Sequence, residues 1–414
     1  MSLLARKALR KHETIVKHLM PTTSALSNRW FLLGVLFVIR TAFGFQFQSV
    51  ASVSSLLIDD LNIGFVEVGT LIGLYMLPGV VIALPSGLLG KRFGDRRVAG
   101  SGLALMAIGA IVMGLSNTYP LVIVGRLTTG VGAVLLNVAV TTMIANLFAD
   151  REIRTALGVM LGSWPFGVAL GLVTQGVVAE AYSWQMVMFM TSAVSATSLI
   201  LLTTLVRIPT VTISQDSKQQ SIGFLIPWRE LIPVSMAGIA WAAFNIGFSI
   251  HFSFTPDLLV AQGMSSADAA GIVSIGIWIT MFSVPLGGLL SERIGRPNTM
   301  MVAFCILTGV ILGLFPYLSI ALVLSLLIGL TIGPPPASIV ALPAQVLSAE
   351  NRGPGFGIFY TWYYGGMAIG PAIAGFGRDL TGSAAVPLYF GALMFGLVIV
   401  FLALFRAAAR KYAG

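Results

Sequence analysis

Three ionisable side chains lie inside long apolar runs of this sequence: Arg40, Arg126 and His251. A charged or titratable group at membrane depth is costly and rare, so each of the three is a functional candidate. Acidic side chains such as Asp59 and Glu180 fall only at the ends of these runs. Buried guanidinium groups without a buried acid need neutral acceptors, water or a bound anion. The chemistry that this pattern predicts is therefore anion binding.

Each candidate also has a structural interpretation. Arg40 lies about 15 Å along a helix axis from Trp30, which places it near the middle of a bilayer core of about 30 Å. At that depth its guanidinium either binds an anion or has a structural role in which it bonds only to the protein. Arg126 shares a helix face with Asn137, because successive residues turn by about 100° and the two side chains fall within about 20° of each other. This face is a candidate water-facing wall, and a buried structural arginine is the alternative. His251 is a candidate proton carrier, although a lone buried histidine is more often a hydrogen-bonded structural group.

Aromatic side chains crowd one apolar run, where Tyr360, Trp362, Tyr363 and Tyr364 lie close together, and Trp278 lies in an earlier run. Most of them are expected to pack against other helices, while one or two stack on a substrate. The side chains predicted to contact the substrate are Arg40, Gln48, Arg126, Asn137, Asn245, His251 and Tyr363.

The composition indicates which elements hold these side chains. The chain has 414 residues, of which 57% are hydrophobic and 9% are charged, whereas soluble domains carry roughly 25% charged residues. Because a helical span needs about 20 apolar residues, the sequence predicts an all-α membrane protein with about twelve transmembrane helices. Prolines at 334–336 and 343 are expected to interrupt the tenth of them. The predicted spans are 30–57, 66–90, 98–116, 120–147, 156–178, 185–206, 230–257, 269–290, 298–316, 318–345, 355–376 and 386–406.

One polar segment between apolar runs occurs twice. Residues 87–97 read GLLGKRFGDRR, and residues 288–297 read GLLSERIGRP about half the chain later. A repeat of this length in an apolar chain predicts two similar bundles of six helices. The predicted domains are a cytoplasmic basic segment at 1–29, an N-terminal six-helix bundle at 30–207, a cytoplasmic linker at 208–229, a C-terminal six-helix bundle at 230–406 and a cytoplasmic tail at 407–414.

The distribution of positive charge predicts the orientation in the membrane. The formal net charge is +9. Apart from Arg40, Arg126 and Arg378, every Lys and Arg falls on segments that are cytoplasmic when the first span starts inside, as the positive-inside rule requires. Both termini are therefore expected in the cytoplasm of a multi-pass protein of a bacterial-type inner membrane. Segment 1–29 suits an interfacial amphipathic helix and lacks a signal-peptide pattern, and a single cysteine, Cys305, excludes an internal disulfide.

Both copies of the repeated segment resemble the loop signature of the major facilitator superfamily of secondary transporters, and the resemblance spans nearly the whole chain. The matching residues are Gly87, Leu89, Gly90, Arg92, Gly94 and Arg96 in the first copy and Gly288, Leu290, Ser291, Arg293, Gly295 and Arg296 in the second. The family's fourth-span signature is similar to Ile123, Arg126, Gly130 and Gly132. The resemblance implies that spans 1, 4, 7 and 10 line a central cavity, that spans 2, 5, 8 and 11 lie between the halves, and that the halves rock during transport.

The resemblance also implies a cytoplasmic gate at these loops. In the first copy Lys91 occupies the family's acidic place and an acid occupies a basic place, so the charges are exchanged. We predict that Lys91 pairs with Glu350, and the alternative is that it only faces lipid phosphates. In the second copy Glu292 keeps the acid, and we predict that it pairs with Arg151 or Arg154. The residues predicted to act in gating are Gly87, Lys91, Arg92, Asp95, Arg96, Arg151, Arg154, Gly288, Glu292, Arg293, Arg296 and Glu350.

The sequence favours transport over catalysis. It contains one Cys, three His and no nucleotide-binding loop, metal cluster or catalytic triad, so neither an enzyme nor a cofactor is expected. The hypothesis is a secondary active transporter of a small anion, an organic carboxylate or an inorganic oxyanion, that works as an exchanger or proton-coupled symporter. Its expected partners are that substrate, a co-transported proton or counter-anion, and the lipid bilayer, with no nucleic acid and a monomeric state. The alternatives are a multidrug-type exporter of amphipathic or hydrophobic compounds, and a channel or non-transporting receptor.

Overall fold

The structure is a computed structural model that describes residues 23–63, 65–206, 226–264 and 266–412. The described residues form helices and short turns, and no strand is found among them. Eleven spans in this part of the chain are long and apolar enough to cross a membrane, and α15 (Arg352–Thr381) adds a further long helix. The prediction of an all-α membrane protein with about twelve transmembrane helices is therefore confirmed.

The first six spans follow the predicted order. Their boundaries differ from the prediction by a few residues, except that the first helix starts earlier and is followed by a separate short helix. The helices are α2 (Thr23–Ser52), α3 (Ser54–Leu61), α4 (Phe65–Leu74), α5 (Gly79–Phe93), α6 (Asp95–Gly114), α7 (Tyr119–Leu147), α8 (Ile153–Ala181) and α9 (Trp184–Leu205).

The last six spans also keep the predicted order. Short 3-10 turns lie at Phe315–Tyr317, Pro343–Gln345 and Ala349–Asn351. Most of the predicted segment 1–29 and linker 208–229 lies outside the described residues; residues 23–29 belong to α2, and residues 228–229 to α10. The remaining helices are α10 (Trp228–Ala261), α11 (Ser266–Ile294), α12 (Pro297–Leu314), α13 (Ala321–Thr331), α14 (Pro334–Val340), α15 and α16 (Val386–Tyr412).

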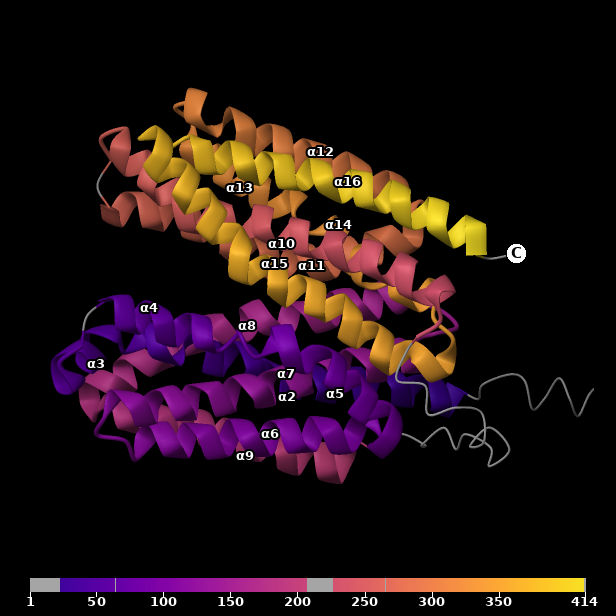
Figure 1. The fold of residues 1–414 in the computed structure, drawn as a ribbon, viewed down its shortest axis with the longest axis horizontal. Helices are drawn as coiled ribbons and strands as arrows, with labels where there is room; N and C mark the ends of the chain where they lie inside the picture. Colours follow the sequence, from indigo (N-terminus) through magenta and orange to yellow (C-terminus); the bar gives the residue numbers. More distant parts are fainter. Residues whose placement is uncertain (1–22, 64, 207–225, 265, 413–414) are drawn as a thin grey trace, which may run out of the picture.

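Two bundles make up the molecule. Figure 1 shows α2 to α9, coloured indigo to magenta, below α10 to α16, coloured red to yellow, with the two groups converging at one end and separating toward the other. The halves pack against each other chiefly through α5 with α15 and α8 with α11, which are the interface spans that the family resemblance implies. We call the end that holds residues 87–97, 146–154, 288–296 and 349–354 the closed end, and the opposite end the open end.

Two spans are broken helices. The second span, predicted as one helix, is interrupted at residues 75–78 between α4 and α5. There the Tyr75 amide bonds to the Ile72 carbonyl instead of continuing the helical pattern, so a carbonyl is left for another partner. The tenth span is divided into α13, α14 and a 3-10 turn that begins at Pro343, which confirms the predicted proline interruption. Irregular backbone at membrane depth is tolerated only where protein or a watery cavity surrounds it.

Candidate functional site

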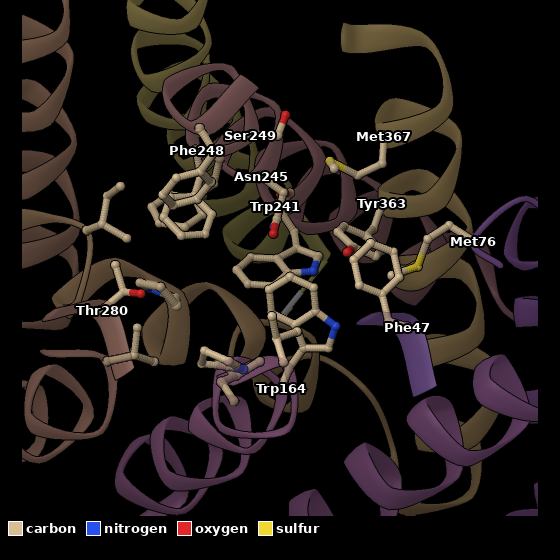
Figure 2. Close-up of a pocket in the computed structure, with 18 of the residues that line it drawn as sticks. Phe47, Met76, Trp164, Trp241, Asn245, Phe248, Ser249, Thr280, Tyr363 and Met367 are labelled. Atoms are coloured by element: carbon tan, nitrogen blue, oxygen red, sulfur yellow. The ribbon is translucent and has the colours of Figure 1, made fainter. Parts of the chain in front are cut away.

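A cavity of about 410 Å³ lies between the two halves. Its walls come from α2, α7 and α8 of the first half and from α10, α11, α14 and α15 of the second, together with Met76 and Ile332 at the two helix breaks. Ligand pockets for small molecules have volumes of roughly 300 to 1,000 Å³, so this cavity suits a small organic molecule. Figure 2 shows part of its lining. Nine of the 24 lining residues are aromatic: Phe43, Phe47, Trp164, Trp241, Phe244, Phe248, Phe252, Tyr360 and Tyr363.

Among the described residues that line the cavity, only Arg40 is charged. Its side chain donates from Nε and Nη2 to Asn137 Oδ1, at 3.2 and 2.9 Å. It also donates from Nη1 to the Met160 carbonyl at 3.0 Å and to Ser163 Oγ at 2.8 Å. Within the described residues no ion pair involves Arg40, so these neutral partners orient the guanidinium without neutralising it. A charge held this way in an apolar cavity attracts an anion.

Asn137 connects Arg40 to the opposite half. Its Nδ2 donates to the Tyr364 hydroxyl at 3.2 Å. One helical turn later, the hydroxyls of Thr141 and Tyr360 share a hydrogen bond of 3.0 Å. The network therefore runs from α2 through α7 to α15, and a single amide serves both the cation and the contact between the halves.

Four of the seven predicted substrate contacts come together in the cavity: Arg40, Asn137, Asn245 and Tyr363. Asn245 lies on α10 and donates from its amide to the Trp241 carbonyl at 2.8 Å. Gln48, Arg126 and His251 are not among the residues that line the cavity. Their predicted role in substrate binding stays a prediction.

Arg126 joins three helices near the open end. It is fully buried and donates to the carbonyls of Leu71 at 2.9 Å, Gln46 at 3.0 Å and Phe47 at 3.0 Å. Its guanidinium also lies 4.5 Å from the centre of the Tyr75 ring. Because the break after α4 leaves the Leu71 carbonyl without its usual helical donor, Arg126 replaces that donor. The contacts describe a structural clamp on the broken second span.

The other two predicted contacts also bond within the protein. His251 is buried, and its Nδ1 lies 3.1 Å from Thr255 Oγ1 on the same helix. Gln48 is half-buried and donates from Nε2 to Ser52 Oγ at 3.2 Å.

The aromatic side chains on one face of α10 were not among the predicted substrate contacts. Trp241, Phe244, Phe248 and Phe252 recur at intervals of three and four residues and all line the cavity, as expected for one face of a helix. This spacing was a usable signal. Trp164 on α8, which faces the same cavity, carries no comparable signal, because a single tryptophan in an apolar run is equally expected to pack against lipid.

The match to a known family covers almost the whole chain. A family model described as Major Facilitator Superfamily matches residues 31–371 and 285–413. The chain belongs to the major facilitator superfamily. It is accordingly a multi-pass membrane transporter, of a family whose members bind small molecules and often co-transport protons.

Relatives within the superfamily differ in the compounds for which they are named. The 3-(3-hydroxy-phenyl)propionate transporter of Escherichia coli (strain K12) is 26% identical over 94% of this chain and 97% of its own. The oxalate:formate antiporter of Oxalobacter formigenes is 28% identical over 71% of each chain. The tetracenomycin C resistance and export protein of Streptomyces glaucescens is 25% identical over 34% of this chain and 26% of its own.

Solved structures of superfamily members share the fold. A structure of the fucose transporter FucP has a TM-score of 0.74 at 16% identity and covers 91% of this chain and 99% of its own. A structure of the proton:xylose symporter XylE has a TM-score of 0.72 at 16% identity, with coverage of 91% and 95%. At this identity the likeness concerns the fold alone.

The first glycine of each superfamily loop lies where the two halves touch. A Cβ atom at Gly87 would lie 2.0 Å from the Gly353 carbonyl oxygen, and one at Gly288 would lie 2.7 Å from the Arg154 carbonyl oxygen. Gly158 faces Gly288 in the same contact. Only a residue without a side chain permits so close a backbone approach, so both copies of the repeat need glycine when this end is closed.

The second loop forms the ion pair that was predicted. Glu292 accepts from the Arg154 guanidinium at 3.0 Å and from the Arg154 backbone amide at 2.8 Å. Because Arg154 lies in the first turn of α8, the carboxylate of one half also caps a helix of the other half, where negative charge is favourable. Arg151, the other predicted partner, instead lies 4.0 Å from Asp150.

The predicted pair of Lys91 with Glu350 is wrong. Lys91 Nζ donates to Asn351 Oδ1 at 3.2 Å, and no ion pair of the described residues joins Lys91 to Glu350. Asn351 in turn donates from Nδ2 to Glu230 at 2.9 Å. A second bond between the halves runs from Arg352 to Asn146 Oδ1 at 2.9 Å. The first loop is therefore tied to the start of α15 through the neutral amide of Asn351, and the end of α7 is tied to α15 through the amide of Asn146.

The remaining predicted gating residues lie at the same end. Arg92, Arg293, Arg296 and Glu350 are exposed. Arg96 bonds within its own half, to the carbonyls of Leu202 and Thr203, and Asp95 packs beside Gly90. None of these residues is described in a bond between the halves, and their role in gating stays a prediction.

Proposed function

We propose that the protein transports small organic carboxylates that carry an aromatic or apolar group, by alternating access between the two halves. The observation that carries this proposal is Arg40, a charged group with no acidic partner among the described residues, in a cavity with nine aromatic residues in its lining. A carboxylate supplies the missing negative charge, and the hydrophobic part of the ligand packs against the aromatic wall.

The choice of an organic carboxylate over an inorganic oxyanion rests on the lining. An inorganic oxyanion has no apolar surface to bury against the phenyl and indole rings, whereas an aryl carboxylate has both parts. Two relatives named above are transporters of carboxylates by name, one of them of an aryl propionate. The alternative, export of hydrophobic compounds, draws support from the same aromatic wall, but Arg40 opposes a cationic drug.

We further propose that the closed end faces the cytoplasm. Basic side chains on several helix ends gather there, among them Lys91, Arg92, Arg151 and Arg293, as the positive-inside rule requires of cytoplasmic loops. Both termini then lie in the cytoplasm of a bacterial-type inner membrane, and the described state faces outward. A proton or a counter-anion completes the transport cycle, and the monomer is the transporting unit.

A thermal-shift screen of the purified protein tests the substrate class. Ligands that bind only the folded state stabilise it by about 2.7 kcal/mol at a hundred times their Kd. We expect aryl carboxylates such as 3-phenylpropionate to raise the unfolding temperature, with little effect from phosphate or sulfate. Stabilisation by lipophilic cations alone would favour the exporter and contradict the proposal.

The Lys91→Ala variant tests the gate. The lost hydrogen bond to Asn351 is exposed, so we expect the balance between the two states, and hence turnover, to change by less than about fivefold. Substrate affinity should be unchanged, because Lys91 is not among the residues that line the cavity. Parallel measurement of uptake rate and Kd separates these effects, and an equal loss in both would count against a gating role.

A further inference from the structure

Two hydrogen-bond donors in the cavity wall have no acceptor. The indole Nε1 atoms of Trp164 and Trp241 are buried, and neither has a hydrogen-bond partner among the described residues. Both residues line the cavity. Buried donors are almost always paired in proteins, so two orphans in one cavity indicate that a ligand supplies the acceptor.

Neighbouring rings fix the direction of both donors. Trp164 packs on Phe47, with ring centres 5.6 Å apart, and Trp241 packs on Tyr363 at 6.0 Å and on Phe244 at 5.7 Å. Figure 2 shows both indole nitrogens on the ring edges that face Phe47 and Tyr363. The two donors are therefore held toward the same part of the cavity.

The charge of Arg40 acts on the same part of the cavity. Arg40 bonds to Asn137, which donates to the Tyr364 hydroxyl. The Tyr364 ring lies 4.9 Å from the ring of Tyr363, on which Trp241 packs. None of the described residues in the lining is acidic, so this part of the chain offers no anionic acceptor in the cavity. Two N–H donors and an uncompensated cation in the wall of one cavity match a carboxylate, which accepts hydrogen bonds and supplies negative charge.

We infer that the indole N–H groups of Trp164 and Trp241 donate hydrogen bonds to the carboxylate bound near Arg40. This inference rests on the proposed function, and it identifies the two indole N–H groups as the donors that determine specificity for a carboxylate. Trp164 belongs to α8 of the first half and Trp241 to α10 of the second. The bound carboxylate thus joins the halves above their closed end, and its binding favours the occluded state over the open one.

The test measures the Kd of 3-phenylpropionate by calorimetry for the purified wild type and for Trp164→Phe and Trp241→Phe. Loss of one hydrogen bond to a charged acceptor weakens binding by about tenfold, and we expect this loss in each variant. Trp278→Phe is the matched control, because Trp278 is 45% exposed and does not line the cavity. Its affinity should equal that of the wild type.

If a phenylalanine variant does not fold, a second pair of variants provides the test. In these, Trp164 or Trp241 is replaced by β-(3-benzothienyl)alanine, which keeps the ring shape and exchanges N–H for sulfur. The same tenfold loss of affinity is expected. In the wild type, the indole ¹H resonances of these two tryptophans should move downfield when 3-phenylpropionate binds. Wild-type affinity in the folded variants would overturn this inference and leave the proposed function intact, whereas a wild type that binds no carboxylate would overturn both.

Discussion

The Arg40→Gln variant is expected to fold and to lose carboxylate binding and uptake. Glutamine keeps an amide that can bond to Asn137, but it carries no charge, so the cavity no longer attracts an anion. Removing one partner of a buried charged contact costs about 2–5 kcal/mol, which corresponds to a loss in affinity of about 30-fold or more. Uptake of radiolabelled 3-phenylpropionate into proteoliposomes, together with its Kd, measures the effect.

The matched control for this experiment is Arg40→Lys. Lysine keeps the positive charge but cannot reproduce the four directed bonds that the guanidinium makes to Asn137, Met160 and Ser163. We therefore expect activity between those of the wild type and the glutamine variant. Full uptake by a folded Arg40→Gln protein would contradict the role of this charge.

The Gly87→Ala variant is expected to shift the transporter away from the state described here. The added methyl group would lie 2.0 Å from the Gly353 carbonyl oxygen, so the two halves must separate at the closed end. Overpacking of this kind costs about 1–3 kcal/mol, a factor of about five to 150 between the two states. Phe93 and Ile294 are both exposed at the closed end. Spin labels attached to Phe93→Cys and Ile294→Cys report the separation of the halves by double electron–electron resonance.

Gly176→Ala provides the same chemical change without the contact, since a Cβ atom at Gly176 meets nothing within 4 Å. The native Cys305 is buried and should not take up the label. Longer distances are expected in Gly87→Ala only. Unchanged distances in that variant would show that the glycine contact does not limit closure.

Hydropathy predicted the spans well, and the proline cluster predicted the interruption of the tenth, but the break in the second span was missed. The fourth span was expected at 120–147 and lies at Tyr119–Leu147. The sequence at residues 75–78 is as apolar as its surroundings, and a single proline such as Pro78 does not signal a break. Pro85, Pro165 and Pro285 all lie inside continuous helices. The break depends on a tertiary contact, in which Arg126 takes up the freed Leu71 carbonyl.

The candidate site was predictable in chemistry and only partly in position. Arg126 and Asn137 share a helix face, but they lie about 16 Å apart along the axis. Asn137 therefore reaches the cavity wall, whereas Arg126 forms the clamp near the open end. Helical periodicity gives the direction of a side chain and not the depth at which a cavity meets it. The donors on Trp164 and Trp241 were missed for a different reason, because only the structure reveals that an indole N–H has no acceptor.

The error at Lys91 has a similar origin. Residues 349–351 form a 3-10 turn, in which neighbouring side chains point about 120° apart. Asn351 therefore faces the first loop, while Glu350 faces solvent. Charge complementarity therefore predicted the correct segment, residues 349–351, but the wrong partner within it, because Lys91 bonds to Asn351 and not to Glu350.

The positive charge of Arg40 in the cavity also has an electrical consequence. A bound monocarboxylate neutralises Arg40, so the loaded site carries no net charge, whereas the empty site carries one positive charge. A membrane potential acts with about 2.3 kcal/mol per elementary charge per 100 mV, and it therefore acts on the return of the empty carrier and not on the loaded step. Exchange of one carboxylate for another is accordingly expected to be indifferent to voltage, while net uptake without an accompanying proton should respond to it.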